Sequence, residues 1–183
     1  MPKILVAPLL CILLLTAPAR AADAGPSAAA SQAFLAEHAR LPGVTVRPSG
    51  LQVRILKSGM GRHFVPGDAV QIYYTAKLVN GMVIDGTSPG LPAPIDPGAT
   101  LTGLGEALLT MREGDHWELT LPPGLAFGAK GGGGGKIGPD QALVFDVTMV
   151  ASVPAARAEA VSRDGVSLAA GNGGTAAYWT IHP

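Results

Sequence analysis

The sequence predicts an antiparallel α+β domain, and three features of its apolar pattern carry that prediction. Apolar and polar residues alternate in several separate segments, which is the pattern of strands with one buried face. A single segment has the three- and four-residue spacing of a short amphipathic helix. Strand segments lie on both sides of this helix along the chain, an order that favours an antiparallel sheet over alternating parallel βα units.

The first 21 residues have the features of a signal peptide. A positive charge at Lys3 precedes an apolar stretch at 4–15, and the sequence Ala-Arg-Ala at 19–21 fits an A-x-A cleavage site. The alternative is a transmembrane anchor, which needs about 20 apolar residues, and Pro18 ends this stretch earlier. We therefore expect export to the periplasm, with cleavage after position 21 and no membrane attachment afterwards.

Residues 22–43 are predicted to form a linker and a short helix. The linker is rich in small residues up to Ser31, which is expected to cap the helix. The helix would contain Phe34, Leu35 and His38 and would end before the Pro-Gly pair at 42–43.

The strand segments are separated by turn signals. Asn80-Gly81 predicts a tight hairpin with a short returning strand up to Asp85, and the four prolines within 86–102 predict a loop. The other segments expected are a strand with Leu51, Val53 and Ile55 inside, a strand at 70–78, a helix at 103–111, a strand at 117–121, a loop at 122–140 and a strand at 143–149. The segment 153–183 is rich in Ala and Gly, has no steady period, and is expected to be a mobile tail.

Composition and spacing exclude several kinds of chemistry. Basic and acidic residues number 13 each, so net charge gives no electrostatic case for binding nucleic acid. The only cysteine, Cys11, lies in the predicted signal peptide, and the four histidines have no metal-ligand spacing, so we expect no metal and no cofactor. The glycine run before Lys136 fails as a phosphate-binding loop because Ile137 replaces Ser or Thr. Asp85 stands alone among apolar residues, either as a turn cap or as a functional acid.

Several short motifs occur together, in order, across about residues 44–152. They are Gly50-Leu51-Gln52, Tyr73-Tyr74-Thr75, Ile84-Asp85-Gly86, Gly103-Leu104-Gly105-Glu106-Ala107-Leu108, Leu125-Ala126-Phe127-Gly128 and Leu143-Val144-Phe145-Asp146-Val147. In this order and spacing the chain resembles the FKBP-type peptidyl-prolyl cis/trans isomerases. The lead-in at 34–44 is similar to that of the exported bacterial Mip-like group of this family.

The resemblance implies a curved antiparallel sheet, a half-barrel wrapped around one short helix, with a ligand pocket between them. It assigns the catalytic positions to Tyr74, Asp85, Phe127 and Phe145. It assigns the substrate-binding positions to Ile84, Ala93, Ile95, Thr100, Leu101, Leu104 and Ile137, with the Leu101 N–H facing a substrate carbonyl.

The sequence departs from the family pattern inside this predicted pocket. Leu104 stands where the family has Trp, Ile84 replaces a usual Phe, and Phe127 lacks the hydroxyl of the family's Tyr. Ala93 and Ile95 also stand where many members have aromatic residues. These changes predict a wider, less aromatic pocket with reduced activity, although Leu104 and Ile84 could equally serve to fill the core.

The function implied is cis/trans isomerisation of X-Pro bonds in exported polypeptides. A dry apolar pocket disfavours the charge separation of the planar amide and so eases its rotation, without any nucleophile. The alternative is a proline-binding or chaperone module on the same fold with little isomerase activity. The partners expected are X-Pro-containing polypeptides, and a monomer is expected because the N-terminal segment is short for a dimerising helix.

Overall fold

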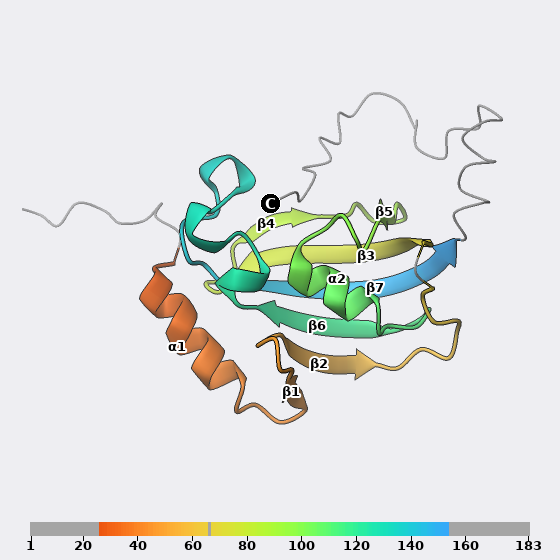
Figure 1. Ribbon diagram of the computed structural model, residues 1–183, viewed down its shortest axis with the longest axis horizontal. Helices are drawn as coiled ribbons and strands as arrows, with labels where there is room; N and C mark the ends of the chain where they lie inside the picture. The colour runs from red at the N-terminus through yellow and green to blue at the C-terminus, as the bar shows by residue number, and fades with distance from the viewer. Residues whose placement is uncertain (1–25, 66, 154–183) are drawn as a thin grey trace, which may run out of the picture.

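The protein is described by a computed structural model over residues 26–65 and 67–153. The predicted signal peptide at 1–21 and the predicted tail beyond residue 153 lie outside the described residues. Within them, the chain forms one sheet, two α-helices and three short 3-10 helices (Figure 1).

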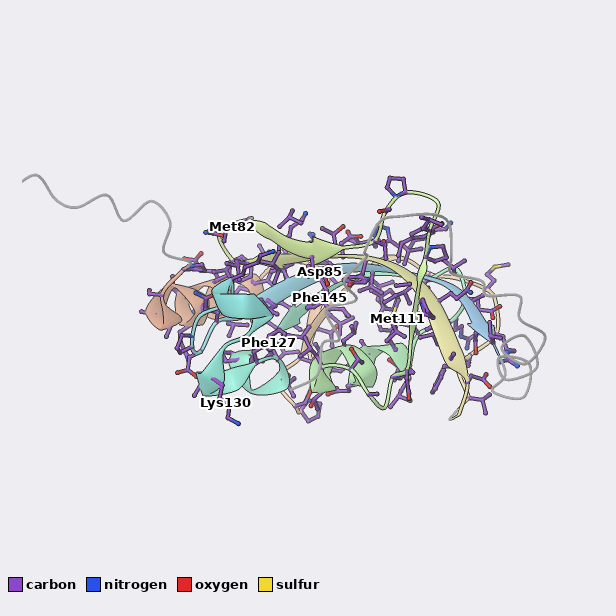
Figure 2. The ribbon with its side chains drawn as sticks, turned by 90° about the horizontal axis from the view of Figure 1, so that it is seen from above. Met82, Asp85, Met111, Phe127, Lys130 and Phe145 are labelled. Atoms are coloured by element: carbon purple, nitrogen blue, oxygen red, sulfur yellow. The ribbon has the colours of Figure 1, made fainter. Side chains whose placement is uncertain are left out.

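The sheet is antiparallel and open, with seven strands among the described residues. Its order is β1-β2-β6-β7-β3-β4, and β5 pairs with β3 outside this path. The sheet is curved and α2 lies against its inner face (Figures 1 and 2), so the predicted fold class is confirmed. The strands are β1 Val44–Val46, β2 Gln52–Lys57, β3 Ala69–Leu78, β4 Val83–Gly86, β5 Ala93–Ile95, β6 His116–Leu121 and β7 Leu143–Val153.

Strand β3 connects the halves of the sheet. It pairs with β7 along its whole length, from Ala69 opposite Val153 to Leu78 opposite Leu143. Beyond Leu78 the predicted hairpin forms, with Gly81 at a φ of +86° and the Leu78 N–H donating to the Met82 carbonyl. This hairpin brings β4 back along β3 and leaves β4 at one end of the strand order.

Helix α2, Thr102–Leu108, packs closely because its first turn contains two glycines. A Cβ at Gly103 would lie 2.8 Å from Leu121 Cγ, and one at Gly105 would lie 2.3 Å from the Pro97 carbonyl oxygen. The predicted apolar stripe is completely buried at Leu104 and Leu108. The helix ends at Leu108 rather than at the predicted residue 111, although Met111, the last residue of the stripe, is also buried.

Two strand predictions are wrong in part. Ile55 was expected inside with Leu51 and Val53, but its side chain is 54% exposed, at the position where the pairing of β2 with β6 becomes irregular. The proline-rich segment 86–102 is not entirely loop, because β5 lies within it and pairs with β3. Pro94 has no N–H to donate, and such a residue is tolerated in a short strand at the margin of a sheet. The loop predicted at 122–140 contains the 3-10 helices η1 Pro123–Leu125, η2 Gly128–Lys130 and η3 Gly133–Gly135 and an isolated bridge between Gly132 and Ile137.

The N-terminal helix α1, Ala28–His38, begins earlier than the sequence predicted. Ser27 is its N-cap, with the hydroxyl oxygen accepting a hydrogen bond of 3.1 Å from the Ala30 N–H. Ser31, the predicted cap, is buried one turn into the helix, where its hydroxyl oxygen accepts from the Ala142 N–H at 3.1 Å. The serine therefore ties α1 to the segment before β7 instead of starting the helix.

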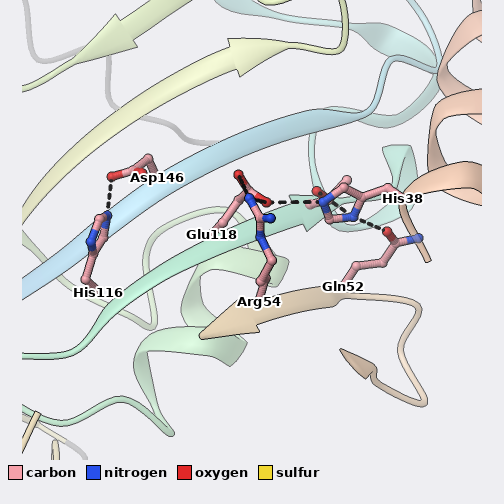
Figure 3. A network of polar contacts seen from close by, with 7 residues as sticks. His38, Gln52, Arg54, His116, Glu118 and Asp146 are labelled. Carbon is pink, nitrogen blue, oxygen red and sulfur yellow. Dashed lines mark hydrogen bonds and ion pairs between the residues drawn. The ribbon is translucent and has the colours of Figure 1, made fainter. Parts of the chain in front are cut away.

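His38 fixes the other end of α1 to the sheet through a polar network (Figure 3). Its Nδ1 lies 2.7 Å from Gln52 Oε1, and the Gln52 amide is oriented by donating from Nε2 to the Leu35 carbonyl. Its Nε2 lies 3.2 Å from the Glu118 carboxylate, which also binds Arg54 at 2.9 Å. Both ring nitrogens of His38 thus have a polar partner, and these contacts fix the orientation of the ring.

Glu118→Gln is expected to weaken this attachment and to change the acid limb of the stability profile. Burial raises the pKa of Glu118, but hydrogen bonds from Arg54 and His38 outweigh it and lower the pKa below its ordinary value of 4.5. A carboxyl with a lowered folded-state pKa stabilises the protein above its unfolded pKa, and that stability is lost as pH falls through the folded pKa. At pH 7 the substitution should reduce the free energy of unfolding by about 1–2 kcal/mol, and the difference should shrink as the pH falls below the ordinary Glu pKa of 4.5.

Urea unfolding at several pH values measures this effect, with Asp146→Asn as the matched control. Asp146 forms a second histidine–carboxylate pair in the sheet, with its Oδ1 2.8 Å from His116 Nε2 (Figure 3). The side chains of His116 and Asp146 are both more exposed than those of His38 and Glu118. Exposed pairs contribute about 0–1 kcal/mol, so the control should lose less. Equal losses in the two variants, or a pH-independent loss at Glu118, would contradict the role given to the network.

Candidate active site

A hydrogen-bonded pair, Tyr74 on β3 and Asp85 on β4, forms the polar part of the candidate site. The Tyr74 hydroxyl donates to Asp85 Oδ2 at 2.7 Å, and the Gly86 N–H donates to Asp85 Oδ1 at 2.8 Å. The hairpin brings the two residues together, because β4 returns directly beside β3. Both carboxylate oxygens therefore have donors, and the carboxylate is held in one orientation.

The electrostatics of this pair keep Tyr74 a hydrogen-bond donor. Burial raises the pKa of its hydroxyl, and the hydrogen bond to Asp85 and the negative charge of Asp85 raise it further. The phenol is therefore protonated throughout the physiological pH range. Asp85, in turn, acts as an acceptor whose charge is partly satisfied, which suits a positioning or polarising role better than proton abstraction.

Aromatic side chains surround this pair on the inner face of the sheet. The Tyr74 ring lies 6.2 Å from that of Phe145 on β7, tilted by 32°, and Phe145 is 1% exposed. Phe127 approaches from the segment that follows β6, on the same side of the sheet as α2 (Figure 2). It packs against the core and against Gly132, where a Cβ would lie 2.3 Å from the Phe127 ring.

The predicted substrate-binding residues divide into buried and accessible ones. Leu101, Leu104 and Ile137 belong to the core and are 1%, 0% and 5% exposed. Leu104 therefore has no surface open to a ligand, and its contact with a substrate stays a prediction that requires the side chains over it to move. The burial of Leu104 shows the other role considered for this residue, which is to fill the core.

The accessible members of the set lie around these buried residues. Ile84 and Ile95 are half-buried and pack against the core, and Ala93 is half-buried on β5 opposite Ile72. The hydroxyl of Thr100 is buried and has no hydrogen-bond partner among the described residues. An unpartnered buried hydroxyl is costly, and among the predicted substrate-binding residues Thr100 is the one whose side chain carries such an oxygen.

Sequence reasoning missed the glycines that shape the site. A Cβ at Gly131 would lie 2.3 Å from the Ile137 carbonyl oxygen, so Gly131 and Gly132 allow the segment to fold back over Phe127 and Ile137. The run of five glycines was visible in the sequence, but there it indicated only that the segment belongs to the loop predicted at 122–140. Its positive φ values, for example +65° at Gly131, show instead why glycine is needed there.

The assembled site combines apolar side chains with one hydrogen-bond acceptor and one donor. Its surface is aromatic and aliphatic around one oriented carboxylate and one phenol donor. Among residues 26–65 and 67–153, there is no cluster of three or more His, Cys, Asp or Glu side chains that could hold a metal ion.

Comparisons with known proteins agree with this architecture. The family described as FKBP-type peptidyl-prolyl cis-trans isomerase matches residues 61–150. The peptidyl-prolyl cis-trans isomerase Mip of Coxiella burnetii is 38% identical over 121 residues, which are 66% of this chain and 52% of that protein. The FKBP-type 22 kDa isomerase of Escherichia coli is 39% identical over 118 residues, which are 64% of this chain and 57% of that protein. The chain thus spans about half the length of the curated relatives it matches.

One solved structure of this family matches the chain over nearly the whole length of the solved protein. AtFKBP13 is 30% identical, with a TM-score of 0.57, and the match covers 60% of this chain and 98% of that one. The matched family, the identity to its members and the shared fold together show that this chain belongs to the FKBP-type peptidyl-prolyl cis-trans isomerases.

Proposed function

We propose that the chain catalyses cis/trans isomerisation of X-Pro bonds in polypeptides. The observation that carries this proposal is the oriented Tyr74–Asp85 pair beside the Phe145 ring, on a largely apolar surface. Aromatic and aliphatic side chains suit the proline ring, while the pair gives the site one fixed donor and one fixed charge.

The physical basis of the rate enhancement is the loss of amide resonance during rotation. The planar amide carries negative charge on oxygen and positive charge on nitrogen, and resonance gives rotation a barrier of about 18–20 kcal/mol. Water favours the charge-separated planar form, whereas a site that excludes water favours it less. Every 1.4 kcal/mol or so removed from the barrier raises the rate about tenfold.

Tyr74, Asp85, Phe127 and Phe145 carry the reaction in this proposal. The aromatic rings exclude water from the proline, and the Asp85 carboxylate, held by Tyr74 and Gly86, orients or polarises the bound amide. Ile84, Ala93, Ile95, Thr100, Leu101, Leu104 and Ile137 form the surrounding substrate-binding surface. Each of these roles is inferred from position and chemistry in the fold.

A protease-coupled assay on a tetrapeptide with a central X-Pro bond tests the activity. The expected result is cleavage whose slow phase accelerates in proportion to the concentration of the protein. Binding of the peptide without acceleration would overturn the proposal and leave a binding module in its place.

We also propose that the chain is exported to the periplasm and processed after position 21. The sequence of the first 21 residues supports this, and the relatives include a protein named outer membrane protein MIP in Legionella longbeachae. No helix within the described residues is long and apolar enough to cross a membrane. Mass spectrometry of protein from its native host should find a mature N-terminus near Ala22, and recovery of the chain with Met1 intact would contradict export.

A further inference from the structure

The side of β3 that faces away from β7 is paired with two different strands, β4 and β5 (Figure 1). β4 accompanies β3 as far as the Thr75–Gly86 pair, and β5 accompanies it from the Ile72–Ala93 pair. Tyr74 lies between these two partners. Alternate residues of an antiparallel strand direct their N–H and C=O groups to the same neighbour, so a gap of this kind leaves the backbone of one residue without a strand to bind.

Thr87, the first residue after β4, supplies the missing partners of Tyr74. Its N–H donates to the Tyr74 carbonyl at 2.9 Å, and its hydroxyl oxygen accepts from the Tyr74 N–H at 3.1 Å. The hydroxyl also donates to the same carbonyl at 3.3 Å. One residue therefore binds both backbone groups of Tyr74 at the point where β4 has ended and β5 has not begun.

The segment 85–87 thus holds Tyr74 at both ends. Asp85 accepts from the phenol at 2.7 Å, while Thr87 binds the backbone of the same residue. Gly86 between them permits the close approach, since a Cβ there would lie 3.0 Å from the Tyr74 carbonyl oxygen. The Gly86 N–H also donates to Asp85 Oδ1, so the three residues contact Tyr74 as one unit.

A bulge in β4 makes the register of this unit important. Between the Lys77–Val83 pair and Asp85, β4 contains one residue more than β3. Because successive side chains alternate between the two faces of a sheet, regular pairing would turn Asp85 to the face opposite Tyr74. The bulge brings the carboxylate to the same face as the phenol, and the hydrogen bonds from Thr87 fix the pairing on the far side of the bulge.

We propose that Thr87 is a positioning residue for the isomerase site, whose hydroxyl closes the gap beside β3 and so holds the Tyr74 phenol against Asp85. The inference rests on the proposed isomerase function and gives Thr87 no contact with the substrate. Thr87 is half-buried, so water can replace its hydroxyl when it is removed. The loss should therefore appear in the position of Tyr74 more than in the stability of the fold.

Thr87→Val removes the hydroxyl and keeps the shape of the side chain. It should lower kcat/KM for an X-Pro tetrapeptide about three- to tenfold, which corresponds to one hydrogen bond. Thr87→Ser retains a hydroxyl and should stay within about twofold of the native chain. Both rates are taken per folded molecule, with the folded fraction measured by urea unfolding.

Thr110→Val is the matched control for the loss of a threonine hydroxyl. The Thr110 hydroxyl also donates one hydrogen bond and accepts one, to the Ala107 carbonyl and from the Arg47 guanidinium, both at 2.8 Å. It belongs to the segment after α2 and has no contact with Tyr74 or Asp85 among the hydrogen bonds of the described residues. The substitution should lower the melting temperature and leave the rate per folded molecule unchanged.

Two measurements on the pair itself do not depend on turnover. Hydrogen-exchange NMR should find the Tyr74 amide protected in the native chain and in Thr87→Ser, and exchanging faster in Thr87→Val. The Tyr74 ring signals should titrate at a lower pH in Thr87→Val, because a looser contact weakens the hydrogen bond and the charge of Asp85 that raise the pKa of Tyr74. Neither result is expected for Thr110→Val.

A double variant tests whether Thr87 acts through the pair. In an Asp85→Asn background, Thr87→Val should lower the rate by less than about twofold, because both changes disturb one interaction. Additive losses, an unprotected Tyr74 amide in the native chain, or a Thr87→Val chain with the native rate and the native Tyr74 titration would each overturn the positioning role. A native chain that accelerates no isomerisation would remove the isomerase proposal, while exchange and titration would still decide whether Thr87 holds the pair.

Discussion

Asp85→Asn is expected to lower kcat/KM for X-Pro peptides about 10- to 100-fold, because an interaction with a charged group contributes about 1.5–3 kcal/mol. The amide has the shape of the carboxylate and can still accept from Tyr74 or Gly86, so the fold should persist. Isomerase assays and thermal melting on one preparation separate the two roles considered for this residue. A lower melting temperature with an unchanged rate per folded molecule would make Asp85 a turn cap only.

Titration of Tyr74 gives this substitution an independent readout. Two of the three causes that raise the pKa of Tyr74 come from Asp85, its hydrogen bond and its charge, while burial is the third and the largest. Ultraviolet absorbance should therefore show the tyrosine ionising at a lower pH in Asp85→Asn than in the native chain, though still above its ordinary range. Asp96→Asn, a change at a carboxylate on a different loop, should alter neither the Tyr74 titration nor the rate.

Leu104→Trp is expected to destabilise the fold by about 1–3 kcal/mol, the usual consequence of overpacking, and to raise the isomerase rate of the protein that remains folded. Leu104 is completely buried, so a larger ring must displace its neighbours. An added aromatic contact with the proline ring contributes about 0.5–1.5 kcal/mol, which would raise kcat/KM roughly two- to tenfold.

Leu108→Trp is the matched control for this change. Leu108 lies one turn further along α2, is also completely buried, and belongs to the same apolar stripe. Leu108→Trp should lower the stability of the fold by a similar amount without raising the isomerase rate, because position 108 is not one of the predicted site positions. Equal isomerase rates in the two variants would show that residue 104 does not limit the rate. Ile84 and Phe127 would then be the next residues to substitute.

The sheet and α2 could be predicted because their pattern is local. The alternation along β3 and β7 and the stripe of Leu104, Leu108 and Met111 each depend on one buried face of one element. The predicted hairpin at Asn80-Gly81 also needs only the residues that form it. The place of Tyr74 beside Asp85 then follows, since a hairpin sets its two strands side by side.

The parts that could not be predicted depend on contacts between distant segments. Ser31 resembles a helix cap in sequence, and its burial is explained only by Ala142, 111 residues away. Strand β5 forms across prolines because β3 is available beside it. Residues 26–28, residues 82–84 and several residues between 134 and 141 line one pocket, and no local pattern indicates that these segments meet.

Two-dimensional exchange NMR on an X-Pro peptide, with the protein at a small fraction of the peptide concentration, tests the central claim most directly. We expect exchange cross-peaks between the cis and trans proline signals at mixing times at which the free peptide shows none, because uncatalysed isomerisation takes about 10–100 s. The same cross-peaks should weaken strongly with Asp85→Asn. Peptide signals that shift on binding while cis and trans remain unexchanged, or full exchange without the Asp85 carboxylate, would contradict the account.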